Sequence, residues 1–306
     1  MPATRAAHAR SAVFVPDGEL SSRRAFLRSS ASALLMSGFG SALLSACGGG
    51  GSSADLPDTP RLASVDNFRD IAGAGGGYQT VDGRQVRRGV FYRSNTLTLS
   101  AADKAVIDTL NIATVYDLRT PGEIARVADV MPTGAAYHSI NVTGDDDQTV
   151  PPVQMSSSAT AMMESAERAY VTGATQRAAY GALLSQLAAT PGVQLIHSAA
   201  GKDRTGWVAA LLLSMANVPL DIIMQDYLLT NTYSAASINA KVAAVQAENG
   251  DAAAMLDAPF FSVQDSFLQA GFDQVQASYG TMSAYLTTGL GMTQASVDAL
   301  RDRLLV

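Results

Sequence analysis

Short apolar runs alternate with longer amphipathic segments along the chain, and this alternation predicts strands joined by helices. The runs at 86–93, 114–118, 136–142 and 192–196 have the length of buried strands. Ser100 opens a segment with helical spacing of apolar residues and an acidic first turn, which is the pattern of a capped helix. A mainly parallel sheet flanked by helices fits this order, so we expect a single α/β domain.

Helical spacing dominates from residue 159 onward. The segment 159–190 ends in an apolar face. The next helix is predicted over 205–215, and its part 208–215 is apolar all round and should therefore be buried. Further helices are predicted at 219–229, 238–256, 263–286 and 293–305. This helical mass follows the most informative motif of the chain, so it should cover or flank the site that the motif forms.

The N-terminal region has the composition of an export signal. Arg23 and Arg24 form a twin-arginine motif, and a modestly apolar stretch at 31–46 follows them. Residues 44–47, Leu-Ser-Ala-Cys, resemble a bacterial lipobox in which Cys47 becomes the lipidated first residue. The alternative is that Cys47 is an incidental cysteine near a signal peptide.

These features divide the chain into three parts. We expect a twin-arginine lipoprotein signal peptide over 1–46, a lipidated cysteine and flexible tether over 47–61, and one folded domain over 62–306. The mature protein is then exported by the twin-arginine route and anchored to a membrane through Cys47, on the periplasmic or outer-membrane side.

Charge narrows the choice of partners. Residues 1–46 contain five arginines and two acidic residues, so 16 basic and 25 acidic residues remain and the net charge is near −9. An acidic body is repelled by nucleic acid and by anionic lipid, so we expect no nucleic-acid partner and membrane attachment through acyl chains alone. Cys47 is the only cysteine, so disulfides do not stabilise the domain.

The segment 197–206 reads His-Ser-Ala-Ala-Gly-Lys-Asp-Arg-Thr-Gly between a predicted strand and a predicted helix. Small residues entering a helix let successive backbone N–H groups converge on an anion, and the helix dipole adds positive potential there. Arg204 adds a planar fork that matches phosphate oxygens. A nucleotide-binding Walker loop is disfavoured, because Ile196 and Asp203 stand where it needs glycine and a hydroxyl residue. The segment therefore predicts a phosphate-binding loop.

Six blocks in this order resemble the bacterial protein tyrosine phosphatases. The blocks are 67–70, 92–94, 117–120, 197–206, 226–228 and 279–280, and the resemblance covers about 62–306. It implies a tyrosine-phosphatase-like α/β fold and hydrolysis of phosphotyrosine, in some members with phosphoserine, phosphothreonine or phosphoinositides. The partner is then a phosphorylated protein, a phosphoinositide or a small phosphomonoester, and neither a metal nor another cofactor is needed.

The resemblance also assigns roles within the loop. Ser198 stands where the family carries its cysteine nucleophile, and an alcohol does not ionise near neutral pH as that thiol does. Arg204 and the loop amides hold phosphate oxygens, and Thr205 resembles the hydroxyl that steadies the nucleophile. The phosphate-binding residues are then Ser198, Ala199, Ala200, Gly201, Lys202, Asp203 and Arg204.

Several roles stay open at this stage. Asp145 is the best match for the general acid, although Asp146 and Asp147 are alternatives and such a run is often a solvated turn. His197 anchors the loop or acts as a base for Ser198. Two functional classes compete: a slow phosphomonoester hydrolase, and an inactive pseudophosphatase that binds phosphorylated ligands.

Two charged pairs are also ambiguous. Lys202 and Asp203 set selectivity or are solvated loop charges. Asp117 and Arg119 line the pocket or form a bracing ion pair.

Overall fold

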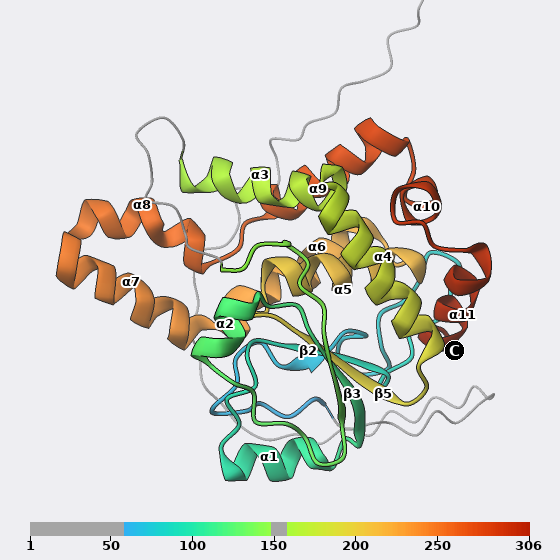
Figure 1. Ribbon diagram of the computed structural model, residues 1–306, viewed down its shortest axis with the longest axis horizontal. Helices are drawn as coiled ribbons and strands as arrows, with labels where there is room; N and C mark the ends of the chain where they lie inside the picture. The colour runs from blue at the N-terminus through green and yellow to red at the C-terminus, as the bar shows by residue number, and fades with distance from the viewer. Residues whose placement is uncertain (1–57, 148–157) are drawn as a thin grey trace, which may run out of the picture. The chain divides into compact units, whose positions relative to one another are not determined.

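The computed structural model describes residues 58–147 and 158–306, so the signal peptide, Cys47 and most of the tether lie outside the described residues. One sheet has the order β1-β2-β5-β3-β4, in which β2, β5, β3 and β4 are parallel and β1 is antiparallel to β2 (Figure 1). The strands are β1 Arg69–Asp70, β2 Phe91–Ser94, β3 Ile112–Asp117, β4 Ala136–Ser139 and β5 Val193–His197. The expected α/β domain with a mainly parallel sheet is confirmed.

The helices form two unequal layers around this sheet. They are α1 Ala101–Asp108, α2 Pro121–Arg126, α3 Ala159–Thr172, α4 Ala174–Ala189, α5 Asp203–Met215, α6 Leu220–Tyr233, α7 Ala235–Asn249, α8 Asp251–Phe261, α9 Asp265–Tyr279, α10 Met282–Ala284 and α11 Gln294–Leu304, with a π-helix at Tyr285–Gly289. In Figure 1, α1 lies below the sheet and α3, α4, α5, α6 and α9 lie above it.

Alternating side chains of the strands supply both cores. Tyr116 and Ile196 face the large helical layer, where α5 is buried along nearly all its length. Val115 and Leu195 face the opposite way and pack with Ile107 of α1. The two-residue period of a strand thus divides one continuous apolar run between two layers.

Helix starts follow their local sequence, whereas several predicted boundaries are wrong. Ser100 caps α1 by accepting a hydrogen bond from the backbone N–H of Asp103, as expected. The predicted strand at 86–93 begins only at Phe91, because Gly89 has a left-handed φ of 75° and breaks the extended run. The strand predicted at 136–142 ends at Ser139.

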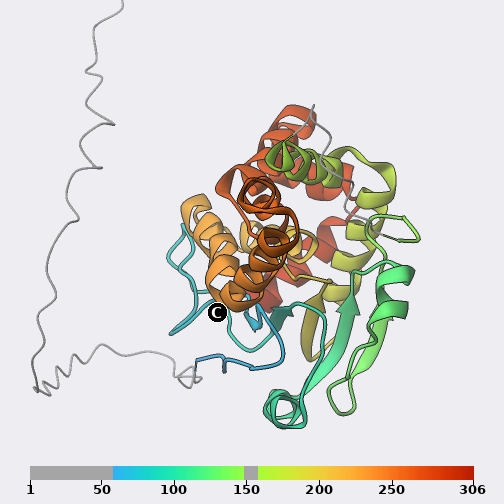
Figure 2. The same ribbon diagram turned by 90° about the vertical axis from the view of Figure 1, so that its left-hand side faces the viewer.

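Two long predicted helices are divided by glycines. The segment 238–256 is interrupted at Gly250, whose φ is 84°, so α7 and α8 form a hairpin that faces the viewer in Figure 2. The segment 263–286 is interrupted at Gly280, whose φ is 73°. Both are left-handed conformations that end helices and favour glycine.

Domain contacts begin before the expected boundary at 62. Thr59 accepts a hydrogen bond from the backbone N–H of Asp70, and the guanidinium of Arg61 lies 3.3 Å from the ring centre of Tyr233. Across the described ranges, no helix combines the length and apolar character that a membrane span requires.

Candidate phosphate-binding site

The signature segment forms a tight loop between the central strand and a buried helix. Strand β5 ends at His197, residues 198–202 turn, and α5 begins at Asp203. Gly201 has a φ of 64°, and a Cβ there would lie 2.3 Å from the carbonyl oxygen of Ser94, so only glycine fits. The positive end of α5 therefore faces the concave side of the loop, as an anion site requires.

Ser198 and Thr205 meet inside the loop. The Thr205 hydroxyl donates to Ser198 Oγ at 2.9 Å, and both residues are almost fully buried. Among the described residues, no carboxylate or imidazole forms a hydrogen bond with Ser198 Oγ. The arrangement steadies the hydroxyl but offers it no base.

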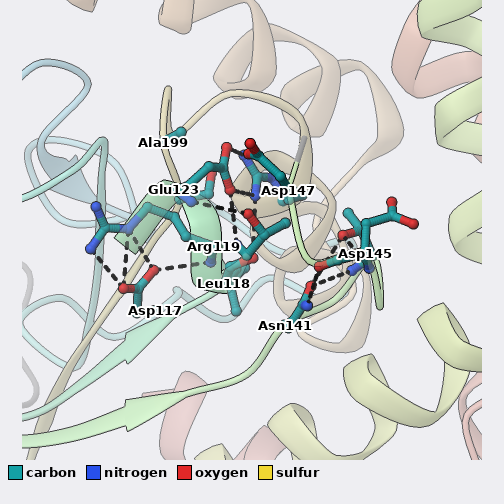
Figure 3. Close-up of polar contacts among 12 residues, drawn as sticks. Asp117, Leu118, Arg119, Glu123, Asn141, Asp145, Asp147 and Ala199 are labelled. Carbon is teal, nitrogen blue, oxygen red and sulfur yellow. Dashed lines mark hydrogen bonds and ion pairs between the residues drawn. The ribbon is translucent and has the colours of Figure 1, made fainter. Parts of the chain in front are cut away.

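Arg204 is held by a carboxylate that the sequence did not reveal. Its Nη1 and Nη2 atoms donate to Glu123 at 2.6 and 2.8 Å, and Nη1 lies 3.3 Å from the carbonyl oxygen of Leu118 (Figure 3). Burial raises the pKa of Glu123, but the hydrogen bonds and charge of Arg204 outweigh burial and keep the pKa below its usual value. The only local signal was a capping box, in which Thr120 and Glu123 begin α2.

Lys202 and Asp203 form an ion pair within the loop. Lys202 Nζ lies 3.0 and 2.9 Å from the two carboxylate oxygens of Asp203, and the side chains are only 7% and 17% exposed. The interpretation of these residues as solvated charges is therefore wrong. Glu167 of α3 is fully buried nearby; burial, followed by the charge of Asp203, raises its pKa well above the usual value.

The predicted acid lies on an exposed flap. The three aspartates at 145–147 are all exposed. Asn141 donates to the backbone oxygen of Asp145, and the Asp145 carboxylate points away from Glu123 (Figure 3). The rest of the flap, 148–157, lies outside the described residues, so the acid role of Asp145 stays a prediction.

Two buried polar clusters flank the loop. The first, which we call the Asp226 cluster, consists of Asn67, Arg69, Tyr78, Arg93 and Asp226. Asp226 accepts hydrogen bonds from Arg69 Nε at 3.2 Å, from Arg93 Nη1 at 3.4 Å and from the Tyr78 hydroxyl at 3.2 Å. It lies on the β2 side of β5 and joins three of the six blocks, namely 67–70, 92–94 and 226–228.

The second, the Asp117 cluster, consists of Asp117, Arg119, Asp129, Tyr137 and His197. Arg119 Nη2 donates to Asp117 at 2.8 Å (Figure 3). It also donates to Asp129 at 2.7 Å. Asp117 and Arg119 thus form a bracing ion pair. Burial raises the pKa of Asp117, but the hydrogen bonds from Arg119 outweigh it and the pKa stays below its usual value.

His197 does not anchor the loop through a side-chain hydrogen bond. Its Nε2 lies 3.2 Å from Asp129 Oδ2 without the alignment of a hydrogen bond, and its backbone oxygen accepts from the N–H of Leu118. The ligand atoms of Asp117, Asp129 and His197 are close enough to share a metal ion. However, Arg119 already supplies a positive charge to both carboxylates, so these residues do not suit a cation.

A polar pocket of about 230 Å³ adjoins the loop. Ala199, Ala200 and Lys202 form the loop wall, and Ser234 and Lys241 lie on the wall made by α6 and α7. Ser234 ends α6 and begins α7, and its buried hydroxyl has no hydrogen-bond partner among the described residues. The signature loop therefore opens beside a space that a ligand can fill.

Comparison with known proteins identifies the family of the chain. A sequence model of the tyrosine phosphatase family matches residues 60–306. A Cupriavidus necator protein whose name describes it as a tyrosine-protein phosphatase is 31% identical over 79% of this chain and 92% of its own length. The triple specificity protein phosphatase PtpB of Mycobacterium tuberculosis is 28% identical over 80% of this chain and 98% of its own, and a tyrosine-protein phosphatase of Nostoc commune is 27% identical over 67% and 70%. This chain belongs to the tyrosine phosphatase family.

Proposed function

We propose that this protein binds phosphomonoesters in the loop 198–204 and hydrolyses them only feebly. The observation that carries the proposal is the loop itself, with Ser198 at its start and Arg204 in the first turn of a buried helix. Glu123 holds the Arg204 guanidinium at this position, so its fork is ordered before a ligand arrives. Ordered donors of this kind bind tetrahedral oxyanions well.

The feeble turnover follows from the surroundings of Ser198. A hydroxyl attacks phosphorus only as its proton leaves, and the described residues place Thr205, a donor, against Ser198 Oγ instead of a base. The alternative function is a pseudophosphatase that binds the same ligands without turnover. The absence of a base beside Ser198 among the described residues also favours the pseudophosphatase. The two functions differ only in the rate of phosphomonoester hydrolysis.

The pocket beside the loop should bind the part of the substrate to which the phosphate is esterified. Lys241 and Asp66 give its wall both charges, Ser234 gives a hydroxyl and Phe261 a ring. This mixture suits a tyrosyl side chain on a phosphoprotein, and it also suits the hydroxyls of a phosphoinositide or another small phosphomonoester. Rates on a phosphotyrosine peptide and on a soluble inositol phosphate would separate these classes.

The function is tested on the full chain with p-nitrophenyl phosphate and with tungstate, a phosphate-like oxyanion. We expect wild type to bind tungstate and to turn over slowly, and Ser198→Cys to raise kcat on the order of a thousandfold because a thiolate replaces an alcohol. Arg204→Ala should abolish tungstate binding. Wild type that equals Ser198→Cys in rate contradicts the role given to position 198, and binding that survives Arg204→Ala places the site elsewhere.

The general acid can be identified in the active background. Starting from Ser198→Cys, Asp145→Asn should remove the limb of the pH profile of kcat that reports an acid, with little change in KM. Asp146→Asn and Asp147→Asn are matched controls one and two residues away. If one of these controls removes the limb and Asp145→Asn does not, the acid is reassigned to that residue.

We also propose that the protein is exported and anchored through Cys47. The support is the order of twin arginines, apolar stretch and Leu-Ser-Ala-Cys before a glycine-rich segment. Membrane fractions of cells that express the full chain should hold the protein until detergent is added. Cys47→Ala should move it to the soluble fraction, and a protein that stays in the membrane without Cys47 would contradict the anchor.

A further inference from the structure

The carbonyl oxygen of Gly201, in the middle of the signature loop, accepts two hydrogen bonds from side chains. Asn67 Nδ2 and Arg93 Nη2 each donate to it at 2.7 Å. Arg93 Nη2 also lies 3.4 Å from the carbonyl oxygen of Lys202. Two donors on one carbonyl fix the plane of the peptide that joins Gly201 to Lys202.

These two donors are themselves held by the Asp226 cluster. Arg93 is completely buried and donates to Asp226, while Arg69 bridges Asp226 and the side-chain oxygen of Asn67. Asn67 adopts a left-handed φ of 58°, a conformation that asparagine and aspartate tolerate. Arg93 therefore cannot swing away from Gly201 without breaking its ion pair with Asp226, and Asn67 cannot do so without breaking its hydrogen bond with Arg69.

The cluster also places positive charge behind the loop. It contains two guanidinium groups and one carboxylate. Burial and the neighbouring charge of Arg69 lower the pKa of Arg93 to about 9, so Arg93 stays protonated at neutral pH. A further carboxylate, that of Asp70, lies 3.8 Å from Arg88 Nε. The surplus positive charge favours an anion on the other side of the loop.

The peptide geometry connects the buried donors to the ligand side. Across a trans peptide the carbonyl and the next N–H point in opposite directions. Because the Gly201 oxygen faces the Asp226 cluster, the N–H of Lys202 faces away from it. Among the described residues, the backbone N–H groups from Ala199 to Lys202 have no hydrogen-bond acceptor, as expected of groups that hold an anion.

We propose that Asn67 and Arg93 are positioning residues for oxyanion binding, because their hydrogen bonds to the Gly201 carbonyl turn the Lys202 N–H toward the bound phosphate. This inference rests on the proposed phosphate-binding function. It gives the Asn-Phe-Arg-Asp and Tyr-Arg-Ser blocks a shared role, since both set the direction of one peptide in a loop more than one hundred residues further along the chain.

The sharpest test is Asn67→Asp in the full chain, followed by calorimetry with tungstate. Aspartate has the same shape and still accepts from Arg69 as a stronger ion pair, but it presents an oxygen to the Gly201 carbonyl in place of an N–H. We expect an affinity loss of roughly tenfold to a hundredfold, which is the worth of one hydrogen bond to a charged group. Because the new carboxylate oxygen is repelled by the Gly201 carbonyl, the urea midpoint should also fall, so the affinity is measured on protein shown to be folded. A purely structural role would lower the midpoint and leave the affinity of the folded protein unchanged.

A second variant and a control complete the design. Arg93→Lys keeps the charge but replaces the planar fork, whose two Nη atoms reach Asp226 and Gly201 separately, with a single nitrogen on a flexible chain, so tungstate affinity should again fall. Asn111→Asp makes the same exchange as Asn67→Asp at an exposed residue that also has a left-handed φ, of 52°, but that does not contact Gly201, and it should leave the affinity within about twofold.

The outcomes separate the two proposals. Wild type that fails to bind tungstate overturns the phosphate-binding function itself. Wild type that binds, with Asn67→Asp and Arg93→Lys binding equally well, overturns only the positioning role. In the Ser198→Cys background, Asn67→Asp should lower kcat/KM for p-nitrophenyl phosphate by a similar factor, and Asn111→Asp should leave it nearly unchanged.

Discussion

The two polar clusters beside the signature loop have similar parts and opposite charge. Each is centred on a buried aspartate that accepts from an arginine and from a tyrosine hydroxyl. The Asp226 cluster has two arginines and one carboxylate, whereas the Asp117 cluster has two carboxylates and one arginine. One flank of the loop therefore carries surplus positive charge, and the other carries surplus negative charge before any charge on His197 is counted.

The clusters also differ in what they contact. The Asp226 cluster donates directly to the Gly201 carbonyl. In the Asp117 cluster, Arg119 donates to its own carboxylates, to the backbone oxygen of Val127 and weakly to Thr96, which in turn contacts Ala199. A ligand-binding role is therefore expected for the first cluster, and a stabilising role for the second.

The largest effect is expected from Arg119→Met. It leaves Asp117 and Asp129 buried without their shared cation, which should lower the free energy of unfolding by about 3–5 kcal/mol. Urea unfolding measures this loss. Arg126→Met is the control, because the Arg126–Asp147 pair is exposed and its loss should cost no more than about 1 kcal/mol.

The same variant also tests the division of roles. Tungstate affinity of the folded Arg119→Met protein should stay within about twofold of wild type, because Arg119 does not touch the loop backbone. A tenfold loss of affinity at full folding would mean that both clusters position the loop.

Lowering the pH should change the stability contributed by the two flanks of the loop in opposite directions. Burial raises the pKa of Asp70, next to the Asp226 cluster, to about 6, whereas the pKa of Asp117 is held below its usual value. The folded state therefore binds a proton on Asp70 more readily than the unfolded chain does, and the stability this gives is complete below about pH 4 and lost as pH rises through 6. Asp117 contributes stability above about pH 4 that is lost as pH falls through its folded pKa.

Between pH 7 and pH 4.5 the Asp70 effect should raise the free energy of unfolding by about 2 kcal/mol, at about 1.4 kcal/mol per pH unit. Asp70→Asn should remove this part of the slope in urea unfolding measured across that range. Asp82→Asn, at an exposed turn, should leave the slope in place. An unchanged slope in Asp70→Asn would show that Asp70 is ionised throughout the range.

Local chemistry explains what the sequence predicted well. The N-cap at Ser100, the glycine turn at Gly201 and the contact of Thr205 with Ser198 depend on residues no more than seven positions apart. The order of strands and helices also follows from spacing along the chain. The predicted boundaries of strands and helices were wrong where a single backbone torsion interrupts the element, as at Gly89 and Gly250.

Long-range partners explain what the sequence did not predict. Glu123 and Arg204 are 81 positions apart, and Asn67 and Gly201 are 134 apart. The positions of these residues along the chain do not indicate that they pair. The contacts arise only when the sheet brings β2, β3 and β5 together. The family resemblance identified most of the sequence blocks that contain these residues. It did not show which residues contact one another.

The smallest predicted effect compares the two tyrosines. Tyr137 donates to Asp117 at 2.8 Å and Tyr78 to Asp226 at 3.2 Å. Asp226 has two guanidinium groups beside it, whereas Asp117 shares one with Asp129, so the hydroxyl should matter more where negative charge is in surplus. We expect Tyr137→Phe to lower the free energy of unfolding by about 1 kcal/mol and Tyr78→Phe by about half as much, measured by urea unfolding at pH 7. If Tyr78→Phe costs more, burial of the hydroxyl outweighs net charge, because Tyr137 is 43% exposed.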